Sequence, residues 1–237
     1  MTPVTLITGT RIGIGIEITD RKRAEAQQAL LLGEMSHRLR NLFTVASSVV
    51  DLSAREAHTP GEMAEAVHDR LGALTRAHDL TRPRPGAPHS YLERETTLHA
   101  LVTAIFLPYA AEDAAARFLW RGCDLRIGGE ALTGLALLLH EFMTNAAKHG
   151  ALSRAGGRVE IDCAVGAGEL AFTWRERGGP LLRGPQECRG FGTYLTERVV
   201  AGQFSGRVTT EWDPEGLVIQ LWLPLERLML GKARRPD

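Results

Sequence analysis

The sequence of 237 residues predicts an α+β fold in which an antiparallel two-helix hairpin precedes a layered domain of helices and antiparallel strands. Apolar residues recur at helical spacing in residues 31–49 and again in residues 63–74, with a short interruption between them. Further along, a strongly helical stretch over about 130–149 is followed by two pairs of strand-like segments. Helices combined with hairpins in this way are typical of a two-layer α+β domain.

The helical hairpin is expected over residues 20–82. Asp20 is a candidate N-cap of the first helix. The segment "TPGE" fits a capping box for the second helix, with Thr59 at the cap, Pro60 at the first helical position and Glu62 at the third. The segment "SAREAH" should interrupt the helices, and "RPRPGAP" at residues 82–88 should end the second helix and act as a linker.

The second domain is expected over residues 90–228. It should begin with a helix near residues 96–109. The segments "GRVEIDCAV" and "ELAFTWRE" flank "GAG" and form one candidate hairpin, and "GRVTTEWD" and "GLVIQLWLPL" flank "PE" and form another. Between the hairpins, "GFGTYLTERVVAG" predicts a glycine turn that leads into a helix.

Composition excludes several classes of protein. Lys and Arg together number 28, as do Asp and Glu, so the net charge is zero, which argues against a general nucleic-acid or membrane-surface binder. No apolar run approaches the ~20 residues of a membrane span. Cys123, Cys163 and Cys188 are too widely spaced for a zinc site and odd in number for a disulfide framework. We therefore expect a cytoplasmic protein.

The opening segment "TLITGTRIGIGI" has the glycine spacing of short-chain dehydrogenases, which is weak evidence alone. Such an enzyme needs a Tyr and a Lys four residues apart. Here the residues four positions after each tyrosine are acidic or arginine, and no series of βαβ units follows. The segment therefore predicts a strand and a turn, and the nucleotide site is expected elsewhere. The tyrosines are Tyr91, Tyr109 and Tyr194, and the residues four positions later are Glu95, Asp113 and Arg198.

The segment "LLLHEFMTNAAKHGAL" is the better nucleotide candidate. On a helix at ~100° per residue, Glu141, Asn145 and Lys148 fall opposite an apolar face. An ordinary solvated face would give the same pattern. An amide oxygen suits Mg²⁺, however, a lysine one turn on can meet phosphate, and a glutamate one turn back can orient or accept a proton.

Two glycine motifs complete the predicted pocket. In "WRERGGP", Glu176 ends a strand and could accept a hydrogen bond from an adenine amino group, while Gly178 and Gly179 permit close backbone approach. In "RGFGTYL", Gly190 and Gly192 precede a helix whose free backbone N–H groups would hold phosphate. Each motif alone also fits a structural turn, but their order along the chain favours a nucleotide site.

The segment "GEMSHRLRNLF" supplies a candidate phosphoacceptor. On a helix, His37 lies ~200° from an apolar face formed by Met35, Leu39 and Leu42, so it should be exposed. An ordinary surface histidine is the simpler alternative. An exposed imidazole that is largely neutral is also a nucleophile able to attack a γ-phosphoryl group.

Together, residues of roughly 23–225 resemble the catalytic core of a sensor histidine kinase of the HWE (His-Trp-Glu) subfamily. The name-giving residues match His140, Trp174 and Glu176. "EMSHRLRN" resembles the phosphoacceptor box and "GFGTYL" the second glycine box. "GIEITDRKRAEAQQAL" resembles the exit from a PAS sensor domain, so residues 1–19 would be a PAS-like remnant or a lead-in strand.

This resemblance implies a Bergerat-type ATP-binding domain that uses ATP and Mg²⁺. Autophosphorylation would occur on His37, followed by transfer to an Asp of a response-regulator protein, and the hairpin is a candidate homodimer interface. Asn145 would hold Mg²⁺ and Lys148 would serve catalysis. The base that assists His37 is not identified by the resemblance, and Glu34 and Glu141 are candidates only. The other implied nucleotide-binding residues are His140, His149, Trp174, Glu176, Gly178, Gly179, Gly190, Gly192 and Thr193.

Two alternatives stay open at this stage. A non-catalytic nucleotide-binding or dimerisation scaffold would share the same motifs. A serine kinase of the anti-sigma type would share the ATP-binding fold, but it lacks a helical hairpin with an "SHRLRN" box.

Overall fold

The computed structural model describes residues 22, 25, 28, 33, 43–51, 53–55, 57–81, 96–109, 117–181 and 195–229. The chain forms two compact units, Met1–Asp51 and Leu52–Asp237. The segment predicted as a PAS remnant lies outside the described residues, as do Glu34, His37, Gly190, Gly192 and Thr193. None of the helices in the described ranges is long and apolar enough to cross a membrane.

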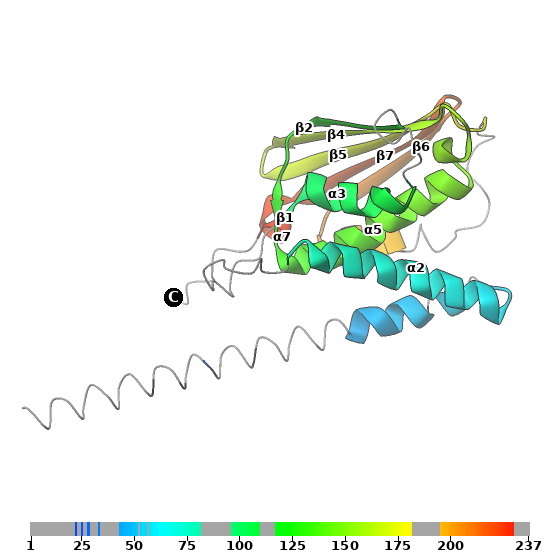
Figure 1. Ribbon diagram of the computed structural model, residues 1–237. Coiled ribbons are helices and arrows are strands. Elements are labelled where there is room, and N and C mark those ends of the chain that lie inside the picture. Colours follow the sequence, from blue (N-terminus) through cyan, green and yellow to red (C-terminus); the bar gives the residue numbers. More distant parts are fainter. Residues whose placement is uncertain are drawn as a thin grey trace, which may run out of the picture. The chain divides into compact units, whose positions relative to one another are not determined.

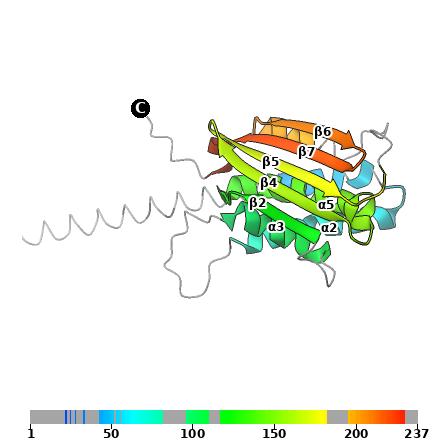
Figure 2. The ribbon, with the colours of Figure 1, turned by 90° about the horizontal axis from the view of Figure 1, so that it is seen from above.

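A five-stranded sheet forms one layer of the second unit, with the strand order β2-β4-β5-β7-β6 (Figure 2). All neighbouring strands are antiparallel except β2 and β4, which are parallel. Both predicted hairpins are confirmed, as β4–β5 and β6–β7. The strands are β2 (Phe118–Gly122), β4 (Arg158–Gly166), β5 (Glu169–Arg177), β6 (Arg207–Asp213) and β7 (Gly216–Pro224).

Helices α3 (Leu98–Phe106) and α5 (Gly129–Lys148) cover one face of this sheet, and α2 (Pro60–Asp79) lies on their far side (Figure 1). The apolar face of α5 is buried against the sheet, where the ring centroids of Phe142 and Trp174 on β5 lie 5.6 Å apart. The opposite side of α5 contacts α2. Helix α5 is therefore enclosed between the sheet and α2 over much of its length.

Short elements complete the unit. Strand β1 (Thr96–Thr97) pairs with β3 (Arg126–Ile127) in a separate two-stranded sheet, and η1 (Leu107–Tyr109) extends α3. The helix expected after the second glycine motif is helical at residues 195–197 and continues as a π-helix, η3 (Arg198–Gln203). The remaining elements are η2 (Ala151–Ser153) and α7 (Leu225–Leu228).

The start of α2 follows the predicted capping pattern. The Thr59 hydroxyl accepts a hydrogen bond from the Glu62 N–H (3.2 Å), and Pro60 opens the helix. The Glu62 carboxylate accepts a hydrogen bond from His58 N (2.8 Å), one residue before the cap. The predicted interruption at residue 53 was placed too early, because residues 53–55 are still helical. Ala54 and Arg55 favour helix, which explains the extension.

Candidate functional site

Helix α5 presents its predicted site residues to two different environments. Glu141, in the middle of the helix, is buried, with 5% of its surface exposed. Asn145, Lys148 and the C-cap residue His149 are exposed. The expectation that Glu141, Asn145 and Lys148 share one open polar face was therefore wrong for Glu141. The reason is that α2 covers the middle of α5, an arrangement that the periodicity of α5 cannot reveal.

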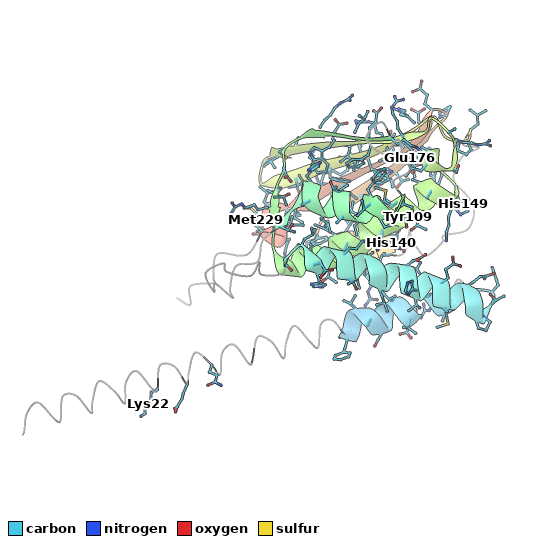
Figure 3. The ribbon with its side chains drawn as sticks, viewed as in Figure 1. Lys22, Tyr109, His140, His149, Glu176 and Met229 are labelled. Atoms are coloured by element: carbon cyan, nitrogen blue, oxygen red, sulfur yellow. The ribbon has the colours of Figure 1, made fainter. Side chains whose placement is uncertain are left out.

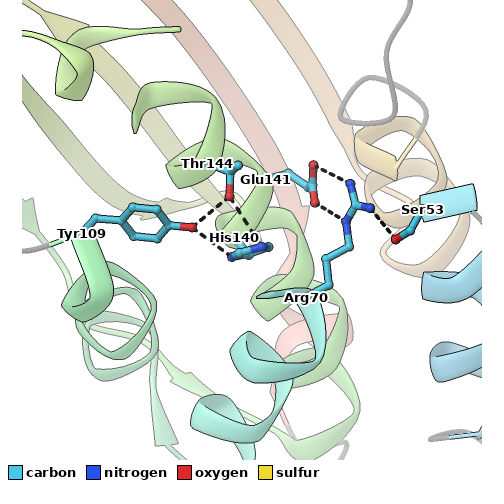
Figure 4. Close-up of polar contacts among 6 residues, drawn as sticks. All are labelled: Ser53, Arg70, Tyr109, His140, Glu141 and Thr144. Carbon is cyan, nitrogen blue, oxygen red and sulfur yellow. Dashed lines mark hydrogen bonds and ion pairs between the residues drawn. The ribbon is translucent and has the colours of Figure 1, made fainter. Parts of the chain in front are cut away.

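The buried Glu141 carboxylate is held by an arginine of α2. Arg70 Nε donates to Glu141 Oε1 at 2.8 Å, and Arg70 Nη2 donates to Oε2 at 3.4 Å. The remaining arm of the guanidinium, Nη1, donates to the Ser53 hydroxyl at 2.6 Å (Figure 4). Arg70 therefore joins three segments of the second unit that are far apart in the sequence.

His140, the neighbour of Glu141, belongs to a second polar cluster. Its Nδ1 lies 3.5 Å from the Tyr109 hydroxyl, its Nε2 lies 3.5 Å from Thr144 Oγ1, and the two hydroxyl oxygens are 3.0 Å apart (Figure 4). Burial lowers the pKa of His140 to about 4, and the nearby Asp69 carboxylate opposes that shift. Burial likewise raises the pKa of Tyr109. The cluster is therefore uncharged at neutral pH.

A pocket of about 200 Å³ adjoins this cluster. It lies between α2 and the η1–α5 side of the domain, and its lining includes no predicted nucleotide-binding residue other than His140 among the described residues. The structure therefore separates His140 from the exposed end of α5. The lining residues are His68, Asp69, Gly72, Arg76, Pro108, Tyr109 and His140.

The C-terminal end of α5 is the most accessible part of the predicted site. Within the described part of the chain, the Asn145 side-chain amide has no hydrogen bond and Lys148 has no ion pair. The Asn145 carbonyl accepts the N–H groups of His149 and Gly150, both at 2.9 Å, which ends the helix there. An amide and an ammonium group are thus presented together on the last turn.

Glu176 is buried beside this last turn, with 3% of its surface exposed (Figure 3 shows it at the same end of the domain as His149). Its Oε2 accepts a hydrogen bond from Ala151 N at 2.7 Å, and its Oε1 accepts one from the Trp174 indole N–H at 3.3 Å. Burial raises the pKa of Glu176, and these two hydrogen bonds oppose the rise. Glu176 therefore ties β5 to the segment that follows α5.

Trp174, the remaining name-giving residue, is completely buried and packs on Phe142. The only polar atom of its side chain is directed to Glu176. Its place in the structure is in the core, where it orients the Glu176 carboxylate. Its listing among nucleotide-binding residues was implied by the family resemblance, and the structure gives it no surface through which to touch a ligand.

The glycines of this region allow backbone segments to approach one another. A Cβ atom at Gly150 would lie 1.9 Å from Glu176 Oε2, and one at Gly179 would lie 2.8 Å from Ala151 Cα. Gly178 has a φ of 73°, in the left-handed region that favours glycine. The close approach predicted from the glycine pair is present, and it is made to the chain's own backbone at Ala151.

Sequence reasoning missed Arg70, Ser53, Tyr109 and Thr144. It placed Leu71 on the apolar face of α2, yet Leu71 is exposed, and the buried positions are Arg70, Ala73, Leu74 and Ala77. These four follow the i, i+3, i+4, i+7 spacing of a buried helix face. An arginine in register with small apolar residues was therefore the available signal.

Comparison with known proteins shows similarity to histidine kinases. Residues 34–124 match the model of the HWE histidine kinase family. The chain is 35% identical over 220 residues to a blue-light-activated histidine kinase of Rhizobium johnstonii, covering 90% of this chain and 59% of the relative. It is 31% identical over 213 residues to blue-light-activated histidine kinase 1 of Erythrobacter litoralis, covering 89% of this chain and 57% of the relative. The chain thus spans little more than half the length of these relatives.

The fold has a solved counterpart. The blue-light activated histidine kinase EL346 of Erythrobacter litoralis superimposes with a TM-score of 0.55 at 19% identity, covering 79% of this chain and 60% of that one. This likeness confirms the predicted α+β architecture. The family-model match over residues 34–124 and the two relatives confirm the resemblance of this chain to HWE histidine kinases.

Proposed function

We propose that this chain is the catalytic portion of an ATP-dependent protein histidine kinase that phosphorylates its own His37. The observation that carries the proposal is the exposed last turn of α5. There the Asn145 amide and the Lys148 ammonium have no polar partner among the described residues, and Glu176 is buried beside them. Uncommitted polar groups at one end of a rigid helix are what a phosphate-bearing ligand requires.

The residues present fit a magnesium ion bound together with nucleotide phosphates. No group of three or more His, Cys, Asp or Glu side chains suited to a metal occurs in the described ranges. Mg²⁺ usually takes one or two protein oxygens and completes its shell with water and substrate phosphates. The Asn145 side-chain oxygen would supply the protein ligand, and the ion would neutralise phosphate charge. Lys148, one turn of helix away, would contact the phosphate oxygens as a point charge.

The reaction is a phosphoryl transfer between ATP and an imidazole. A bond forms between a ring nitrogen of His37 and the γ-phosphorus, while the bond from that phosphorus to the bridging oxygen breaks and ADP leaves. Positioning and charge neutralisation supply most of the rate in such transfers. The phosphoryl group then passes to an aspartate of a response-regulator protein. Homodimerisation through the hairpin belongs to the same proposal and would be tested by sedimentation.

Glu176 is proposed to favour adenine over guanine. Its Oε1 accepts one long hydrogen bond, so it retains capacity to accept the adenine amino group. Guanine has a carbonyl oxygen at that position, and two facing acceptors cost about 1–3 kcal/mol, or roughly tenfold to hundredfold in affinity.

The test is calorimetric titration of the wild type and of Glu176→Ala with ATP, GTP and NADH. Loss of the ATP preference in the variant supports this role. ATP binding with no preference in the wild type removes Glu176 from base recognition. Tight NADH binding without ATP binding would overturn the kinase proposal.

Labelling with γ-³²P-ATP tests the activity itself. The wild type should acquire an acid-labile, alkali-stable phosphoryl group that is absent from His37→Ala. Asn145→Ala should stay folded, because Asn145 is exposed, and should lose labelling. Arg207→Gln, an exposed change on β6, is the matched control and should label normally. Full labelling of His37→Ala would place the acceptor elsewhere, and ATP binding without any labelling would favour the scaffold alternative.

A further inference from the structure

The contact between Arg70, Glu141 and Ser53 joins α2 to α5 and to the helical residues before α2. Arg70 comes from α2, Glu141 from α5, and Ser53 from the helical residues 53–55 that precede α2. The Arg70 and Glu141 side chains are each 7% exposed, and Ser53 is completely buried. One guanidinium group thus links both helical segments of residues 53–79 to the helix that carries Asn145 and Lys148.

Every nitrogen of this guanidinium donates to a named oxygen. Nε and Nη2 donate to the two oxygens of Glu141 as a bidentate pair, and Nη1 donates to the Ser53 hydroxyl. Bidentate arginine–carboxylate pairs fix relative orientation as well as distance. Removing either member would take away the opposite charge that the other faces in a buried position, which is costly. The pair therefore holds α2 and α5 in one register.

The same geometry bears on the role of Glu141. Both of its carboxylate oxygens already accept hydrogen bonds from a guanidinium, and arginine does not give up its protons in proteins. Asn145 lies four residues further along α5 and Lys148 seven, so the three follow one side of the helix. The pair therefore anchors α5 one turn before the proposed nucleotide-binding groups.

We propose that Glu141 is a positioning residue that docks α2 onto the nucleotide-binding helix through Arg70, and that it is not the base for His37. This inference rests on the proposed kinase activity. The docking fixes α5, which carries the proposed nucleotide-binding groups, against α2. A shift of α5 would move these groups, so loss of the contact should slow phosphoryl transfer. Misplacement of reacting groups by about 1 Å costs roughly a hundredfold in rate, whereas ATP binding on α5 itself should not change.

Initial rates of autophosphorylation, measured over a range of ATP concentrations, give the first readout. They yield kcat, the maximal rate constant, and KM for ATP for each single variant. Arg70→Gln and Glu141→Gln should each lower kcat by about a hundredfold and leave KM for ATP within about twofold of the wild type. Arg70→Lys keeps the charge but loses the fork, and should lower kcat by about tenfold. The matched control is Arg207→Gln, because Arg207 forms a bidentate pair with Glu169 at an exposed place on the sheet. It should leave both constants unchanged.

The exchange Arg70→Glu/Glu141→Arg gives the decisive readout. It restores the ion pair and moves the carboxylate from α5 to α2, so docking predicts recovery of kcat to within about tenfold of the wild type. If Glu141 is instead the base, the exchanged protein stays at the Glu141→Gln level although it folds and binds ATP, and the proposal is overturned.

Two measurements keep the test independent of folding and of the kinase proposal. Thermal unfolding of the two single variants and the exchange should show lower Tm for each single variant and partial recovery in the exchange, whether or not the protein phosphorylates itself. If the exchanged protein does not fold, Arg70→Lys decides, since an unchanged kcat there overturns the docking role. Absence of labelling in the wild type would defeat the kinase proposal, while recovery of Tm would still establish the contact.

Discussion

The middle and the end of helix α5 each bury a glutamate, and the two are stabilised in different ways. Glu141 meets a guanidinium group that binds both of its oxygens. Glu176 reaches the end of α5 from β5 and, among the described residues, accepts hydrogen bonds from two neutral N–H donors, those of Ala151 and Trp174. Both residues are at most 5% exposed. Two carboxyl groups that are buried to a similar extent therefore differ in the charge of the donors that face them.

The difference separates two tasks within one domain. The Glu141 region joins elements through charges, and a buried charge that loses its partner is costly. The Glu176 region joins elements through hydrogen bonds to a carboxyl group whose pKa burial has raised. The first contact pairs opposite charges, whereas the second is made with neutral donors and depends on the protonation of Glu176. Three changes test this comparison.

Breaking the charged contact should have the largest effect. Arg70→Gln removes the guanidinium group that faces the buried Glu141 carboxylate, and the free energy of unfolding should fall by about 3–5 kcal/mol. Arg207→Gln removes the exposed pair with Glu169 and should cost at most about 1 kcal/mol. Urea denaturation of the two variants measures both values. Equal losses would show that the burial of Arg70 and Glu141 has no energetic consequence.

Charging His140, next to Glu141, should be the next largest effect. Its pKa of about 4 in the folded protein is below the unfolded value of 6.5, so the folded state binds fewer protons between these values. The stability that His140 contributes is therefore complete above pH 6.5 and is lost as pH falls through about 4, a change of about 3 kcal/mol. The wild type should lose more stability than His140→Gln over this range in urea titrations at a series of pH values. His58→Gln, at an exposed position, is the control and should follow the wild type.

Replacing Glu176, whose hydrogen-bond donors are neutral, should have the smallest effect. Glu176→Gln offers one acceptor oxygen to two N–H donors, so one donor is left unpaired at a cost of about 1–3 kcal/mol. The raised pKa also makes the contribution of Glu176 to stability depend on pH. The folded wild type holds its proton to higher pH than the unfolded chain, so its stability falls as pH rises from the ordinary carboxyl range through the raised pKa.

The cost of the Gln substitution should therefore be greatest at acidic pH and should shrink as pH rises. Denaturation of both proteins from pH 4 upward measures the difference. A gap that widens with increasing pH would contradict the raised pKa of Glu176.

Local patterns predicted the elements of this fold well. Strand-like segments that flank the short turn sequences "GAG" and "PE" located both hairpins. In the structure the first turn is the two residues Ala167–Gly168, whose φ values of 51° and 79° are those that a type I′ hairpin requires. The cap at Thr59 and the length of α5 were also predicted, because they depend on neighbours within a few residues. The register of α2 was mispredicted at Leu71, since the buried face is set by α5, which is distant in sequence.

The sequence by itself indicated the family resemblance, the order of helices and strands, and the place of Glu176 at the end of a strand. It also placed Asn145 and Lys148 on a common side of α5, because a helix fixes which residues share a face. Only the tertiary structure decided that Glu141 is buried and binds Arg70, whereas Asn145 and Lys148 are exposed. It also decided that Glu176 accepts the Ala151 N–H and that His140 is neutral. These properties depend on desolvation and on charges from elements far apart in the chain, and no local pattern contains them.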